Sequence, residues 1–135
     1  MERQIHSKLF RVLDDLLSGR HDPVATIVEC ETARGFKVIR PGDAPWFRAI
    51  NWRAASVASI KGKRVRLVLL HAFEEGRGSL THTLQEISAA GLKVSIIDPT
   101  RELAATLKRR GWTMRVEGKT FEDREDVWSP PKHVA

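Results

Sequence analysis

Two apolar runs, each followed by a helix-like pattern, most constrain what this chain can fold into. The first run covers residues 65–70 and leads into a glycine-bearing turn at residues 74–79, after which apolar residues recur at helical spacing over 80–90. The second run covers residues 92–97 and precedes another helical pattern over 100–111. Strand, turn, helix, strand and helix in this order predict an α/β unit.

Length and charge bound the rest of the interpretation. The chain has 135 residues, which suits one domain over residues 1–128 with a tail over 129–135. Its net charge of +6 makes an anionic ligand or a polyanionic partner plausible. Cys30 is the only cysteine, so neither an intrachain disulfide nor a cysteine metal cluster is expected. No apolar run approaches the ~20 residues of a membrane span, and we expect a cytoplasmic protein without a membrane partner.

The remaining chain is expected to supply one helix and several strands. Apolar residues at helical spacing predict an amphipathic helix over residues 3–18, with its stripe packed on a sheet. Alternation and β-branched residues predict strands over residues 24–30, 36–39, 56–60, 112–116 and 120–128. The first two of these strands should pair across a turn at Gly35. The third should form a hairpin with the strand over residues 64–73.

One segment before the central unit combines aromatic and cationic side chains. Trp46, Phe47, Arg48, Trp52 and Arg53 lie within eight residues. Aromatic rings interleaved with arginine can stack on bases and bind phosphates. The same rings can equally cap one end of a hydrophobic core. The sequence leaves both interpretations open.

The central unit resembles the core of the GNAT superfamily, the Gcn5-related N-acetyltransferases. The family has a strand, a pyrophosphate-binding turn, a helix, a strand and a helix ending in Gly-Phe, followed by two strands. The corresponding positions are a strand at residues 67–71, the turn Gly76, Arg77 and Gly78, a helix over 80–90, a strand over 92–97, a helix over 100–111, and the pair Gly111 and Trp112. The resemblance covers residues 60–128 and implies an α/β fold with a mixed central sheet and flanking helices.

The resemblance also implies an activity, which is acetyl transfer from acetyl-CoA to an amine acceptor. Backbone amides at a helix N-terminus would hold the pyrophosphate, and the candidates are Gly76, Arg77, Gly78, Ser79 and Leu80. Backbone groups at the preceding strand end would meet the pantetheine arm and the thioester, and the candidates are Leu69, Leu70 and His71. The acceptor would approach from the N-terminal strands, where Trp46, Arg48, Trp52 and Arg53 are candidates to bind it.

Acyl transfer requires a neutral amine, and therefore a base or a water chain. His71 and Glu74 are the best-placed candidates, and Glu29 and Glu31 are lesser ones. The family's frequent tyrosine proton donor falls on Leu107, and the chain contains no tyrosine.

A second departure concerns the charge of the turn. The family's basic or amide residue falls on Glu75, and Arg77 is expected to compensate for it. The missing tyrosine, Glu75 and the basic net charge favour an alternative function. In that alternative the chain is a non-catalytic GNAT-like α/β module that binds nucleic acid or a protein partner. Binding of acetyl-CoA would discriminate between the two functions.

Overall fold

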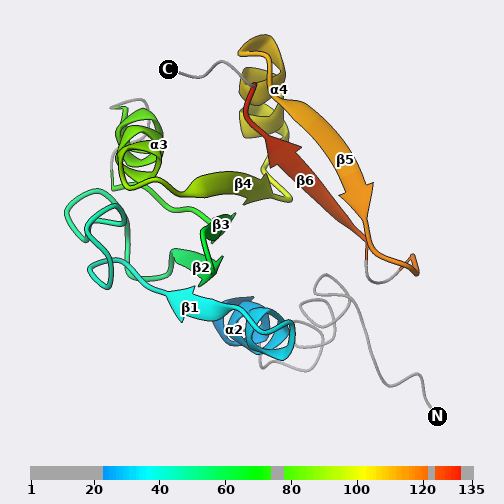
Figure 1. The fold of residues 1–135 in the computed structure, drawn as a ribbon, viewed down its shortest axis with the longest axis horizontal. Helices are drawn as coiled ribbons and strands as arrows, with labels where there is room; N and C mark the ends of the chain where they lie inside the picture. The colour runs from blue at the N-terminus through cyan, green and yellow to red at the C-terminus, as the bar shows by residue number, and fades with distance from the viewer. Residues whose placement is uncertain (1–22, 74–77, 122–123, 132–135) are drawn as a thin grey trace.

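The computed structural model describes residues 23–73, 78–121 and 124–131, shown in colour in Figure 1. In chain order the elements are α2 (Pro23–Ala33), β1 (Lys37–Ile39), β2 (Val57–Lys61), β3 (Arg64–Leu69), α3 (Ser79–Ala89), β4 (Lys93–Ile97), α4 (Arg101–Arg109), β5 (Thr113–Glu117) and β6 (Glu125–Ser129). The helix predicted over residues 3–18 lies outside the described residues. None of the described helices is long and apolar enough to cross a bilayer.

The described strands form one six-stranded sheet in the order β1-β2-β3-β4-β6-β5. Strands β3 and β4 are parallel, and the chain crosses between them through α3. The other neighbouring pairs are antiparallel, and β6 inserts between β4 and β5. The structure therefore confirms the predicted fold class, an α/β fold with a mixed central sheet and flanking helices.

The first face of the sheet is apolar and carries α3 and α4. Alternate residues of the central strands, such as Val65, Leu67 and Ile96, point to this face because neighbouring strand residues point to opposite sides. Ile87 of α3 and Leu107 of α4 pack on them. The cluster also contains the buried aromatic residues Trp46, Phe47, Trp52, Trp112 and Trp128. Burial of these large side chains anchors both helices to the sheet.

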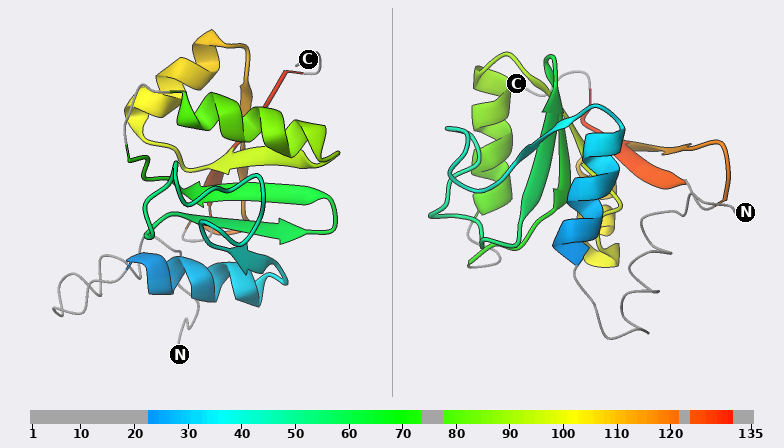
Figure 2. Two further views of the ribbon diagram at one scale, coloured as in Figure 1. Left: turned by 90° about the vertical axis from the view of Figure 1, so that its left-hand side faces the viewer. Right: turned by 90° about the horizontal axis from the view of Figure 1, so that it is seen from below.

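The second face carries α2, and Figure 2 shows α2 and α3 on opposite sides of the sheet. Its apolar cluster is smaller and consists of Ile27, Val57, Val68, Ile97 and Val127. Polar and charged side chains are buried beside it, and they are Thr26, Glu31, Ser59, Arg66 and Glu125. This face is therefore held by charge as well as by apolar contact.

The strand predicted over residues 24–30 is wrong, because this segment belongs to α2. Pro23 suits the first turn of a helix, where its missing N–H is not needed. Ile27 and Glu31 are both buried and lie four residues apart, which is one helical turn. Tertiary contacts through that face outweigh the strand preference of the β-branched residues. As a result, β1 pairs with β2 rather than with residues 24–30.

The predicted central unit agrees with the observed elements to within a few residues at each end. The hairpin of β2 and β3 is present, with Ile60 opposite Val65. Helix α4 begins after Thr100, whose Oγ1 accepts a hydrogen bond from the backbone N–H of Leu103 at 3.2 Å. The last strand is shorter than predicted at its start, because it begins at Glu125. It also ends at Ser129, one residue inside the predicted tail.

Candidate functional site

The parallel pair β3–β4 separates at its carboxyl end. Pairing between the two strands ends at Leu67 and Ile96, whereas β3 continues to Leu69. The end of β4 instead pairs on its other side with β6, through Ile96 and Ile97. Beyond Leu67, the β4-facing side of β3 is therefore not covered by the β4 ladder. Ligands of α/β sheets characteristically bind at the carboxyl ends of strands.

The backbone N–H and C=O groups of Leu70 and His71, just after β3, point in opposite directions. The N–H of His71 lies 2.8 Å from Ser56 Oγ, and its carbonyl accepts a hydrogen bond from the N–H of Arg53 at 2.7 Å. Both groups of His71 therefore point toward the loop before β2. Neighbouring residues of an extended chain direct their N–H and C=O groups to opposite sides. The N–H and C=O of Leu70 consequently point toward the open side, beside the end of β4.

Helix α3 begins at the same end of the sheet. Gly78 is its N-cap residue, with φ 79° and ψ 13°, and no side chain of the described residues caps the helix start. A Cβ built on Gly78 would meet nothing within 4 Å. The first amides of a helix have no intrahelical acceptor, so those of Ser79 and Leu80 are available to a bound group. Glu74, Gly76 and Arg77 lie outside the described residues.

The aromatic residues predicted to bind the acceptor are in the core. Trp46 is 6% exposed and Trp52 is 3% exposed. The indole N–H of Trp52 donates to Thr83 Oγ1 at 2.9 Å, and its ring packs against Phe47. Because both indoles are enclosed by protein, neither can stack on a bound acceptor. We therefore correct the prediction that Trp46 and Trp52 bind substrate.

The two arginines of that segment remain at the surface. Arg48 forms a long ion pair of 3.8 Å with Glu86 on α3. Arg53 lies with its guanidinium over the ring of Phe73, 5.1 Å from the ring centroid. The hydrogen bond between Arg53 and His71 brings Arg53 beside the end of β3. A role for these arginines in acceptor binding remains a prediction.

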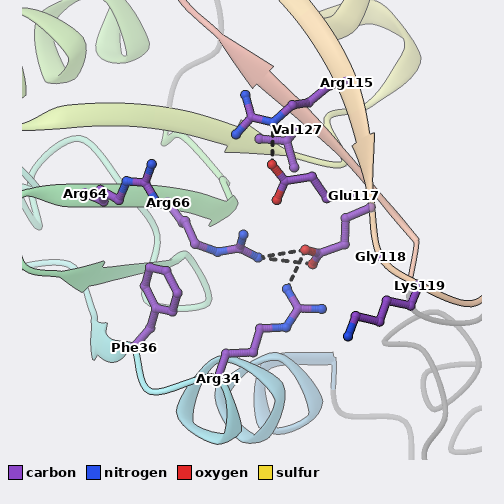
Figure 3. A pocket seen from close by; sticks show the side chains of 10 residues that line it. Arg34, Phe36, Arg64, Arg66, Arg115, Glu117, Gly118, Lys119 and Val127 are labelled. Carbon is purple, nitrogen blue, oxygen red and sulfur yellow. Dashed lines mark hydrogen bonds and ion pairs between the residues drawn. The ribbon is translucent and has the colours of Figure 1, made fainter.

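A second group of residues, on the face that carries α2, did not emerge as a site from the sequence. The side chain of Arg66 is 10% exposed and bridges two carboxylates. Its Nε and Nη2 donate to the two oxygens of Glu31 at 2.8 and 3.0 Å. Nη2 also lies 3.0 and 3.1 Å from the oxygens of Glu125, as the dashed lines in Figure 3 indicate. Ser59 Oγ lies 2.6 Å from Glu31 Oε1, and Arg34 donates to Glu125.

Burial and the carboxylates act on Arg66 in opposite directions. Burial alone would lower the pKa of the guanidinium, because it penalises the charged form. Hydrogen bonds and charge attraction from Glu31 and Glu125 outweigh that effect and raise the pKa above its ordinary value. Glu31, a lesser candidate for the base, is fully buried and committed to this network. The sequence signal was an arginine between two buried strand residues, Val65 and Leu67.

No family model and no curated protein matches the chain. One solved structure is similar, a protein from Agrobacterium tumefaciens that is provisionally described as an acetyltransferase. The alignment covers 96% of this chain and 94% of that protein, at 16% sequence identity and a TM-score of 0.40.

Proposed function

We propose that this protein is an N-acyltransferase that uses acetyl-CoA and transfers the acetyl group to an amine. One observation carries the proposal. The separated end of the parallel pair β3–β4 and the uncapped start of α3 lie at the same end of the sheet, joined by a short connection. This arrangement suits a ligand with an anionic group at the helix and an extended arm at the strand. The order of elements that carries the GNAT resemblance is present in the described chain.

The helix start suits the pyrophosphate. Its first amides and the positive end of the helix dipole favour a bound anion. Gly78 itself adds no side chain beside these amides, and a Cβ built on it would meet no described atom within 4 Å. Arg77 and Gly76 are proposed to complete the turn, with Arg77 offsetting the charge of Glu75.

The strand end suits the thioester arm. The N–H and C=O groups of His71 are already hydrogen-bonded within the chain, and alternation along an extended chain directs those of Leu70 toward the opening. Leu70 is therefore the main candidate to hold the pantetheine arm, with Leu69 beside it. A donor aimed at the thioester carbonyl would stabilise the oxyanion that develops when the amine attacks.

Proton transfer is proposed to involve the exposed side chain of His71, with Glu74 as the second candidate. Acetyl-CoA supplies the activated acyl group, and the chain must accept a proton from the attacking amine. His71 lies two residues beyond the end of β3, near the strand end from which an acceptor would approach. The surface arginines Arg48 and Arg53 are candidates to orient an anionic acceptor.

The test compares two glycines that have nearly the same φ angle but lie at opposite ends of α3. Gly78 and Gly91 have φ angles of 79° and 78°, and a built Cβ has nothing within 4 Å at either one. Gly78 precedes α3, whereas Gly91 follows it. Gly78→Asp should abolish CoA binding, because the carboxylate repels the pyrophosphate. Gly91→Asp should carry a similar backbone strain and keep the affinity.

Calorimetric titration with CoA and acetyl-CoA measures both variants. In the parent, a ligand at 100 times its Kd adds about 2.7 kcal/mol of stability, which a thermal shift detects. Equal affinity in the two variants would place any cofactor elsewhere. If the parent protein does not bind CoA at millimolar concentration, the proposed acetyltransferase activity is contradicted. The non-catalytic module, with nucleic acid or a protein as partner, would then become the better proposal.

A further inference from the structure

A cavity of about 540 Å³ lies on the face of the sheet that carries α2. It is bounded by the α2–β1 connection, by β3 and by the β5–β6 hairpin, as Figure 3 shows. Its lining contains the cationic residues Arg34, Arg64, Arg66, Arg115 and Lys119. Among the described residues, the lining contains only two carboxylates, those of Glu117 and Glu125. A volume of this size suits a small organic molecule rather than a folded partner.

The buried Arg66 is fixed in orientation and keeps hydrogen-bonding capacity. Glu31 and Glu125 engage Nε and Nη2, while Nη1 makes no hydrogen bond with the described residues. An arginine carries five N–H donors, two of them on Nη1. Figure 3 shows the guanidinium reaching into the cavity. Its unused donors are preorganised for an oxyanion, because the carboxylates hold the guanidinium in place before a ligand arrives.

Two further cations of the lining are not neutralised by the described part of the chain. Arg115 pairs with Glu117, and Arg34 pairs with Glu125. Arg64 and Lys119, by contrast, form no ion pair with a described residue. Within the described part of the chain, the cavity therefore retains an excess of positive charge after these pairs are formed.

The lining also offers apolar surface. Phe36 lies beneath the Arg66 guanidinium, with its ring centroid 5.2 Å from Cζ. Val127 of β6 adds an aliphatic group. A ligand that combines an anionic group with a flat apolar body would match the guanidinium and the ring together.

We propose that this cavity is a binding site for a small organic anion, with a carboxylate or a phosphate group at Arg66 and an apolar ring near Phe36. The site lies on the face opposite α3 and is separate from the proposed cofactor site. It therefore does not depend on acyl transfer.

Phenyl phosphate and benzoate are suitable probes, titrated calorimetrically at constant ionic strength. Substitution of Arg66 would disturb the buried carboxylates, so the test variant is Arg64→Gln with Lys119→Gln. The control is Arg101→Gln with Lys108→Gln, which removes the same two charge types from exposed positions on α4. The test variant should weaken the better probe about tenfold or more, and the control should leave it unchanged.

Each outcome decides the proposal. Site-dependent binding of phenyl phosphate alone identifies a phosphate ligand, and site-dependent binding of benzoate alone identifies a carboxylate. If the test and control variants lose the same affinity for the probe, the binding depends on the net charge of the protein rather than on this cavity, and the proposal is overturned. Absence of binding of both probes at 10 mM would also overturn it. The Gly78→Asp variant should bind the probes like the parent, which separates this test from that of the cofactor.

Discussion

The two faces of the sheet are stabilised in different ways. The face beneath α3 and α4 buries aliphatic and aromatic side chains, and its internal polar bond, between Trp52 and Thr83, joins two neutral groups. The face beneath α2 buries Arg66 between Glu31 and Glu125. Apolar burial has no directional requirement. The stability of a buried ion network, by contrast, requires every partner, because the loss of one leaves a buried charge uncompensated.

This difference bears on function. Taking charges out of water is costly, and a buried ion pair often stabilises no more than an apolar replacement would. The presence of the Arg66 network on one face is therefore better explained by a functional role of the charge than by a gain in stability. The adjoining cationic cavity supplies such a use, because the network fixes Arg66 at its wall. Three substitutions can break or sharpen the contrast between the faces.

The largest effect is expected for Arg66→Met. It leaves the carboxylates of Glu31 and Glu125 buried without their shared cation, which should cost about 3 to 5 kcal/mol of unfolding free energy. Urea denaturation measures the loss. Adding Glu31→Gln and Glu125→Gln to this variant should restore part of the stability, because the buried negative charges are then removed. A loss below about 1 kcal/mol for Arg66→Met would show that the network is solvated.

A smaller effect is expected on the apolar face for Thr83→Val. The substitution removes the acceptor of the Trp52 indole N–H, which is then left buried without a partner. The expected cost is about 1 to 3 kcal/mol. Thr81→Val is the matched control, because Thr81 lies on the same helix and is exposed. Similar losses in the two variants would attribute the effect to helix propensity rather than to the buried bond.

The smallest effect is expected for Arg115→Gln. Arg115 and Glu117 form an ion pair on β5, and their side chains are 57% and 44% exposed. Removing such a surface pair should change the unfolding free energy by about 0 to 1 kcal/mol. The same denaturation experiment measures it at low and high salt. A loss as large as that of Arg66→Met would remove the distinction between buried and exposed pairs on this face.

The sequence predicted the central unit well, because local signals and tertiary contacts agree there. Residues of α3 and α4 show helical spacing, and Thr100 caps α4 as its side chain suggests. The α2 segment was misassigned, since its β-branched residues favour a strand while buried Ile27 and Glu31 require a helix. Periodicity cannot report a contact such as that between Glu31 and Arg66, which are 35 positions apart.

The candidate sites show the same limit. Composition left open whether the aromatic segment around Trp46 and Trp52 binds an acceptor or caps the core, and the structure places both indoles in the core. Gly78 was identified correctly as a residue at the start of a helix, because a glycine-bearing turn before a helical pattern is a local signal. The cationic cavity joins residues from the α2–β1 connection to β6, so only the folded chain brings its lining together.

The position of β6 also has a consequence for the order in which the chain folds. Among the described strands, β5 pairs only with β6, and β6 is the last strand in the sequence. Both β5 and the neighbouring edge of β4 are therefore synthesised before the strand that pairs with them. Glu125 arrives with β6, so Arg66 meets its second carboxylate only at that stage. A chain that stops before residue 125 would expose the edge of β4 and leave Arg66 with only one of its two carboxylate partners.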